Sequence, residues 1–315
     1  MHLSKGRRQF LLGATAAPLV GCMNGHPTGP PVRAAAAPPV AAPVARTVTV
    51  RGIPIHCEVH GTGRPLLMLH GFGVDHRMMI DSVEPLFARR GGWQRIYFDL
   101  PGMGKTPRAD FVASADDMLD IVLALVDVLL PDQRFALVGQ SYGGYLGRGV
   151  LARRSDRLDG MALLCPAVVA DFQSRDLPPR NVLVKSPSLV ASLAPADAKE
   201  YEAIAVIQSE GTWKRFRDTI LPAIRAADGP FLERLQKRYA FSFAVDALPQ
   251  RFMKPVLVVV GRQDNVVGYR DAARIMENYP RGTYTVVDRA GHNLLIEQPT
   301  LFEALMNEWL DRLET

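Results

Sequence analysis

From Arg46 onward, the chain alternates short apolar runs with stretches of helical periodicity, and this alternation limits the fold more than any other feature. Strands that alternate with helices along a chain form a mostly parallel sheet covered by helices. The first two runs are separated only by Arg51 and Gly52, so we expect an antiparallel hairpin there. The runs predict eight strands, at Thr47–Val50, Ile53–Val59, Pro65–Leu69, Arg95–Asp99, Phe135–Val138, Leu158–Leu164, Val256–Val260 and Tyr284–Val287.

Helical patterns occupy most of the connections between these strands. In the second helical stretch, the apolar residues have the three-to-four spacing of a helix that buries one face: Met118, Ile121, Val122, Leu125 and Leu129. The stretches predict helices at Arg77–Arg89, Ala113–Leu130, Tyr142–Arg154, Tyr269–Asn278 and Thr300–Leu313.

One connection is much longer than the others. Residues 166–254 have helical patterning without a convincing buried strand, and they separate two parts of the α/β core, at 46–165 and 255–315. A segment of this length is too long for a plain crossover and predicts a helical cap. Open parallel sheets bind ligands beyond the carboxyl ends of their strands, so a cap there would cover a binding site.

Ser141 is a candidate nucleophile. It lies in the sequence Gly139-Gln140-Ser141-Tyr142-Gly143, which fits the pattern GxSxG, follows an apolar strand and begins a helical stretch. In that setting the serine stands on a sharp strand-to-helix turn. A serine hydroxyl is a poor nucleophile at neutral pH and needs a base within hydrogen-bond reach.

His292 is the only one of the seven histidines that follows Ser141, and it lies in a glycine-marked loop. Asp264 follows a strongly apolar strand and precedes His292, which gives the order Ser, Asp, His expected for this type of nucleophile. We expect His292 to be the base and Asp264 the acid that orients it. Asp171 is a second choice for the acid, while Asp288 lies at the end of the preceding strand.

Two backbone amides are candidates for an oxyanion hole, in which N–H donors stabilise the negative charge formed during attack. Tyr142, directly after the nucleophile, would supply one amide. Phe72 would supply the other, since Gly71 and Gly73 allow its loop to turn the amide inward. For the neighbouring His70 we favour a role in bracing this loop over a role as base.

These motifs together resemble those of the α/β-hydrolases. His70–Gly73 (HGFG), Phe98–Thr106 (FDLPGMGKT), Gly139–Gly144 (GQSYGG), Gly261–Asp264 (GRQD) and Ala290–His292 (AGH) occur in that family's order. The resemblance covers about Arg46 to Leu313 and implies an eight-stranded sheet with a cap. PGMGKT does not fit a nucleotide-binding P-loop, because Asp99 stands where that pattern needs glycine, so Asp99 is interpreted as structural.

The residues and the resemblance both favour hydrolysis of a small-molecule carboxylic ester through an acyl-enzyme, with no cofactor and no metal. One alternative is a carbon–carbon bond hydrolase of the meta-cleavage-product type, although the HGFG loop lacks the longer glycine and proline pattern usual in those enzymes. Another is a cofactor-free perhydrolase on the same residues. The non-enzyme alternative is a surface-tethered binding protein with a lapsed site.

The first 22 residues resemble an export signal. Arg7 and Arg8 precede the apolar stretch Phe10–Gly21, as in twin-arginine leaders, and a generic secretory leader is the alternative. Leu19–Cys22 resembles a lipobox, which would place a lipid on Cys22 and tether the protein to a membrane. Residues 23–45 are rich in Pro and Ala and are interpreted as a linker. The expected location is the periplasm of a bacterial cell, or its membrane as an anchored lipoprotein.

The charge balance and the cysteines exclude other classes. Without the three cations of the leader, the formal charge falls from +5 to +2, which gives no basis for a nucleic-acid partner. Besides Cys22, the chain has only Cys57 and Cys165, so it has no disulfide framework. Both lie in apolar strand-like runs, which favours buried free thiols, with a Cys57–Cys165 disulfide as the alternative.

Overall fold

The computed structural model describes residues 42–315. The expected export signal at 1–22, with Cys22, and nearly all of the expected linker lie outside these residues. The first strand begins at Val44, two residues before the start expected for the folded core. In the described range, no helix has both the length and the apolar character needed to span a bilayer.

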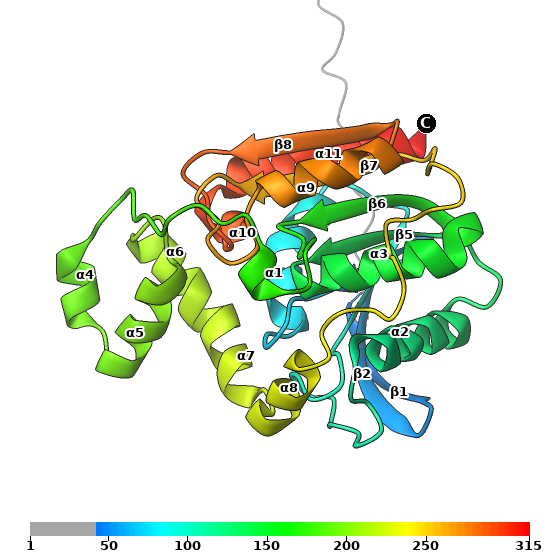
Figure 1. The fold of residues 1–315 in the computed structure, drawn as a ribbon, viewed down its shortest axis with the longest axis horizontal. Coiled ribbons are helices and arrows are strands. Elements are labelled where there is room, and N and C mark those ends of the chain that lie inside the picture. Colours follow the sequence, from blue (N-terminus) through cyan, green and yellow to red (C-terminus); the bar gives the residue numbers. More distant parts are fainter. Residues whose placement is uncertain (1–41) are drawn as a thin grey trace, which may run out of the picture. The chain divides into compact units, whose positions relative to one another are not determined.

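An eight-stranded sheet forms the centre of the fold, in the order β1-β2-β4-β3-β5-β6-β7-β8 (Figure 1). β2 pairs antiparallel with β1 and β4, and the remaining neighbours are parallel. The mostly parallel sheet and the entry hairpin are confirmed. The strands are β1 Val44–Val50, β2 Ile53–His60, β3 Arg64–Leu69, β4 Trp93–Phe98, β5 Phe135–Gln140, β6 Leu158–Leu164, β7 Val256–Gly261 and β8 Gly282–Val287.

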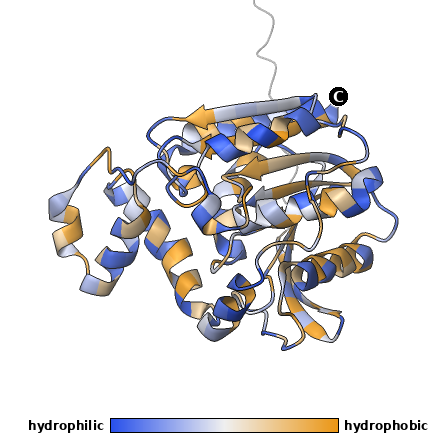
Figure 2. Ribbon diagram, viewed as in Figure 1, coloured by the Kyte–Doolittle hydropathy of each residue, from blue (hydrophilic) through white to orange (hydrophobic). Residues whose placement is uncertain are grey.

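Helices flank the sheet as expected. α3 packs on β3, β5 and β6 and contacts α2. α1 packs on β3 and β4, α11 packs on β6 and β7, and these two helices contact each other. Hydrophobic and hydrophilic residues alternate along α2, whose apolar side is buried (Figure 2). The bounds are α1 His76–Phe87, α2 Ala115–Leu129, α3 Tyr142–Arg154, α9 Arg270–Arg274, α10 Leu294–Glu297 and α11 Pro299–Glu314. The helix predicted at Tyr269–Asn278 is divided into α9 and a 3₁₀ turn at Ile275–Asn278.

Five short α-helices lie between β6 and β7, in the segment expected to form the cap. They gather on the side of the sheet toward which the arrowheads of β6 and β8 point (Figure 1). A single bridge between Val184 and Ile207 is the only strand-like pairing described within this segment. The helices are α4 Pro187–Ser192, α5 Pro195–Ile204, α6 Glu210–Arg215, α7 Leu221–Ala226 and α8 Gly229–Gln236.

Arg148 of α3 holds the two ends of this cap segment together. Its guanidinium donates to the carbonyl of Ala167 at 2.8 Å, near the start of the segment. It also donates to both carboxylate oxygens of Asp246, near the end, at 2.9 and 2.7 Å. The Arg148 side chain is buried, so these hydrogen bonds fix where the cap leaves and rejoins the core.

Candidate active site

Ser141 stands on a strained turn between β5 and α3. Its φ of 54° and ψ of −114° are unfavourable for a residue with a side chain. The turn is possible because a Cβ on Gly139 would lie 2.4 Å from the Gly143 carbonyl oxygen, and one on Gly143 would lie 2.2 Å from that of Leu69. The glycines of the GxSxG pattern therefore let the turn close tightly against the end of β3.

His292 lies between Ser141 and Asp264. Its Nε2 is 2.9 Å from Ser141 Oγ, and its Nδ1 is 2.9 Å from Asp264 Oδ2. The other carboxylate oxygen of Asp264 accepts from the amides of Val266 and Val267 at 2.9 and 3.0 Å. The three side chains come from the segments after β5, β7 and β8, whose carboxyl ends meet at one edge of the sheet.

The two other acids considered for this site do not contact His292, although Asp171 lines the same cavity. Asp171 is exposed, and its carboxylate accepts hydrogen bonds from Gln173 and Ser174. Asp288 is also exposed and accepts from the side chain of Gln263 at 2.9 Å. Neither carboxylate forms a hydrogen bond with the imidazole.

The HGFG loop lies directly against the serine turn. A Cβ on Gly71 would be 3.3 Å from the Cβ of Ser141. The rings of Phe72 and Tyr142 pack edge to face at 5.4 Å. Among the hydrogen bonds of the described residues, the backbone N–H groups of Phe72 and Tyr142 have no acceptor. Both amides are therefore free to donate to an oxygen near Ser141.

His70 braces this loop, as expected. It is fully buried, its Nδ1 donates to the Gly71 carbonyl at 2.8 Å, and its Nε2 accepts from the Leu100 amide at 3.0 Å. Burial lowers the pKa of His70, which favours the neutral ring that this pair of bonds requires.

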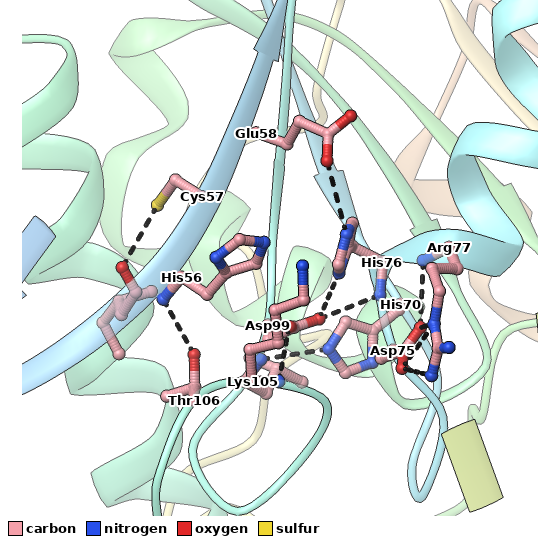
Figure 3. Close-up of polar contacts among 12 residues, drawn as sticks. His56, Cys57, Glu58, His70, Asp75, His76, Arg77, Asp99, Lys105 and Thr106 are labelled. Carbon is pink, nitrogen blue, oxygen red and sulfur yellow. Dashed lines mark hydrogen bonds and ion pairs between the residues drawn. The ribbon is translucent and has the colours of Figure 1, made fainter. Parts of the chain in front are cut away.

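Asp99 connects the same loop region to α1 (Figure 3). Its carboxylate accepts from the backbone amide and the Nδ1 of His76 at 3.0 and 2.7 Å, and from the Lys105 amide at 2.9 Å. Burial alone would raise the pKa of Asp99, but the hydrogen bonds from His76 and from the Lys105 amide, together with the electrostatic effect of the neighbouring His70 and His76, outweigh it and bring the pKa down to about 2. Asp99 is therefore a structural residue, in line with the interpretation of its sequence.

His56, His76 and Asp99 are close enough together to hold a metal ion. Their chemistry argues for a structural cluster instead. One carboxylate oxygen of Asp99 already accepts two hydrogen bonds from His76. Lys105 is near enough to His56 that its positive charge adds to burial in lowering the pKa of that histidine, and such a charge opposes a bound cation.

Glu297 is a residue of the site that the sequence analysis missed. Its Oε2 accepts from the amide of Gly291, beside His292, at 2.6 Å, and its Oε1 accepts from the amide of Val206, in the cap, at 2.7 Å. Burial raises its pKa despite these bonds. The sequence signal is an acid five positions after His292, but only the fold reveals the distant partner in the cap.

Both cysteines of the described range are buried free thiols, so the alternative of a disulfide between them is not realised. Burial raises the pKa of Cys57 to about 12. Burial also raises the pKa of Cys165, and the charge of the neighbouring Asp264 adds to this effect. Both thiols are therefore uncharged and poorly reactive at neutral pH.

A cavity of about 850 Å³ opens beside Ser141 and His292. Apolar residues form much of its wall, and the cap contributes Phe216, Ile220 and Ile224. Seven aromatic residues of the cap are candidates for its lining: Phe172, Trp213, Phe216, Phe231, Tyr239, Phe241 and Phe243. Of these, Phe172, Phe216 and Tyr239 line the cavity. The other four lie elsewhere: Trp213 packs on Tyr201, Phe231 lies against Gly102, and Phe241 stacks between Tyr145 and Phe243.

Known proteins with similar sequences and structures are hydrolases. A family model described as "Alpha/beta hydrolase family" matches residues 66–305. A pimeloyl-[acyl-carrier protein] methyl ester esterase of Legionella pneumophila is 25% identical over an alignment of 277 residues that covers 81% of this chain and 99% of the relative. A 2-hydroxy-6-oxo-6-(2'-aminophenyl)hexa-2,4-dienoic acid hydrolase of Metapseudomonas resinovorans is 24% identical, over 85% of this chain and 91% of its own. The crystal structure of an alpha/beta superfamily hydrolase from Oenococcus oeni has a TM-score of 0.77 and 29% identity, over 86% of this chain and all of that chain.

Proposed function

The chain belongs to the alpha/beta hydrolase family, and from that premise we propose that it is a serine hydrolase that cleaves carboxylic esters through an acyl-enzyme intermediate. Its relatives are esterases and other hydrolases, and the chain is an enzyme of the same general type. The observation that carries the proposal is the hydrogen-bonded series Ser141, His292 and Asp264, with 2.9 Å at each step.

In the proposed reaction, Ser141 Oγ attacks the ester carbonyl carbon while His292 Nε2 takes the hydroxyl proton. The carbonyl oxygen becomes an oxyanion, to which the amides of Phe72 and Tyr142 donate. His292 then passes its proton to the departing alkoxide, and the acyl group remains on Ser141. A water molecule, deprotonated by His292, attacks the acyl-enzyme, and the acid leaves as Ser141 recovers its proton. Asp264 holds the ring with Nδ1–H directed away from the serine and stabilises the imidazolium.

Replacement of the nucleophile tests this proposal. Ser141→Ala should abolish turnover of short p-nitrophenyl esters and labelling by a fluorophosphonate probe, because both need the Oγ atom. The Tm should stay within a few degrees of the wild-type value, which would separate loss of chemistry from loss of fold. Labelling that persisted in the variant would exclude Ser141 as the nucleophile.

A second candidate is hydrolysis of a carbon–carbon bond in a vinylogous diketone, since the Metapseudomonas resinovorans relative carries the name of such an enzyme. The same series of groups could serve both reactions. A panel of fluorogenic esters with increasing acyl length, run beside one meta-cleavage product, distinguishes them. Turnover of the diketone above every ester would favour this candidate.

We further propose that the enzyme acts outside the cytoplasm, with a lipid on Cys22 tethering it to a membrane. The support is the sequence of the leader: paired arginines, an apolar stretch and a cysteine that ends a lipobox-like pattern.

A further inference from the structure

Asn293 immediately follows His292 and lines the same cavity as Ser141 and His292. Only 7% of the residue is exposed. Another side-chain amide, that of Gln140, also lines the cavity beside the reacting groups. The Nε2 of Gln140 lies 3.4 Å from His292 Nε2, so the side-chain amide of Gln140 already has a hydrogen-bond partner within the protein.

The side-chain amide of Asn293 has no such neighbour. Its Nδ2 is buried and meets no acceptor among residues 42–315. Although Asn293 is the N-cap residue of α10, its side chain forms no capping hydrogen bond; its backbone carbonyl accepts from Ile296 and Glu297 instead. The helix therefore does not need the amide group of Asn293.

An unpaired buried amide costs free energy, because it gives up its hydrogen bonds to water and gains none within the protein. A leucine at this position would have a similar size without that cost. In a binding cavity, a ligand that hydrogen-bonds to the unpaired amide offsets this cost. A ligand without such a group leaves the amide unpaired, so the site discriminates against it.

We propose that Asn293 is a specificity-determining residue, whose side-chain amide binds a hydroxyl or carbonyl oxygen that the substrate carries in addition to its scissile ester group. This inference rests on the proposed esterase function and names the substrate class: oxygen-bearing esters, in preference to plain alkyl esters. An amide offers both a donor and an acceptor, and a rotation of 180° exchanges them, so it can pair with either type of oxygen. The remaining wall is largely apolar and accommodates the hydrocarbon part.

The experiment compares two pairs of esters that differ only by exchange of a methyl for a hydroxyl group. Propyl butyrate and 2-hydroxyethyl butyrate place the change on the alcohol side. Methyl 3-methylbutyrate and methyl 3-hydroxybutyrate place it on the acyl side. We expect the wild type to prefer the hydroxylated ester in one pair by about five- to tenfold in kcat/KM, the effect of one net hydrogen bond. Asn293→Leu should bring that ratio to about one.

Two controls separate substrate recognition from a structural effect. Gln173→Leu removes an exposed amide that also lines the cavity and should leave the ratio unchanged. If Asn293→Leu fails to fold, Asn293→Ala serves in its place. A fall in kcat/KM that is equal for both members of each pair, or no preference in the wild type, would overturn the inference.

A binding measurement keeps this inference distinct from the proposed function. In the Ser141→Ala background, calorimetry gives the Kd of the same esters without turnover, and the hydroxylated member of one pair should bind about five- to tenfold more tightly only when Asn293 is present. Absence of hydrolysis of every ester by the wild type would count against esterase activity. The calorimetric ratio would still support or overturn the role of Asn293.

Discussion

At the residue scale, the position of His292 depends on which carboxylate orients it. Asp264 is completely buried and directs one oxygen to the imidazole and the other to two backbone amides. Its geometry is therefore fixed from both sides, unlike that of an exposed acid held by its own loop, such as Asp171. A carboxylate fixed in this way holds a single tautomer of the ring.

We therefore expect Asp264→Asn to lower kcat by about 10³- to 10⁴-fold, because an amide can present N–H to Nδ1 and stabilise the wrong tautomer. Asp171→Asn should change kcat by less than about threefold, since that side chain does not contact the imidazole. Steady-state kinetics on a p-nitrophenyl ester measures both. A large loss confined to the Asp171 variant would reassign the orienting acid.

Sequence order placed Ser141, Asp264 and His292 as candidates because each lies at a predictable point, just after a strand. The roles of Glu297 and Asn293 could not be found in this way. Glu297 accepts a hydrogen bond from Val206, which lies 91 positions earlier in the chain. Asn293 is distinguished by a buried Nδ2 that has no hydrogen-bond acceptor among the described residues. Both facts depend on tertiary packing, which no local sequence pattern encodes.

At the element scale, Asp99 lies in the loop after β4 and helps to hold the HGFG loop, which follows β3. Its carboxylate accepts hydrogen bonds from His76 at the start of α1 and from Lys105 in the loop after β4. Leu100, the residue after Asp99, donates its amide to His70, and His70 donates to the carbonyl of Gly71. The buried ionised carboxylate of Asp99 and the neutral imidazole of His70 therefore stabilise the HGFG loop. Loss of the Asp99 charge should weaken this support.

The stability of the protein should depend on pH through Asp99. Its pKa is about 2 in the folded protein against an ordinary 3.8, so between these values the folded state binds fewer protons than the unfolded chain. The stabilisation is fully present above about pH 4 and is lost as the pH falls toward 2, by about 2 kcal/mol. Urea unfolding of wild type and Asp99→Asn between pH 2 and 6 measures it. The difference between the two should shrink on acidification, and a difference that stayed constant would contradict this assignment.

Apolar runs and helical spacing predicted all eight strands and the helices α1, α2, α3, α9 and α11, but not the four-residue helix α10. The central strands β3, β5, β6 and β7 were the most predictable, because nearly all of their residues are buried. The region after β7 was less predictable: the expected helix tightens to a 3₁₀ turn at Ile275. The bounds of the cap helices were not predicted. They are short, and α5 has only Tyr201 as a buried residue, so its apolar pattern is too weak to locate it.

At the scale of the whole molecule, the residues that the structure describes, 42–315, contain every residue of the candidate site. We therefore expect a chain that starts at residue 42 to keep its esterase activity and Tm.

The full-length protein, expressed in a bacterium with a twin-arginine pathway, should partition into detergent and incorporate labelled palmitate. Cys22→Ala should abolish both while leaving hydrolysis of a soluble ester unchanged. Palmitate labelling of the Cys22→Ala variant would contradict lipidation at this residue.

The carboxylate of Glu297 has a consequence for attempts to change the substrate by exchanging the cap. A transplanted cap would have to supply a backbone N–H group at the position of the Val206 amide. Without it, the buried carboxylate of Glu297, which also accepts from Gly291 beside His292, would lose a hydrogen-bond donor. Chimaeras with a well-packed foreign cap should then lose turnover even on small esters that hardly touch the cap. A graft whose boundaries leave residues 204–208 in place would preserve this joint, so the transferable unit is smaller than the insertion itself.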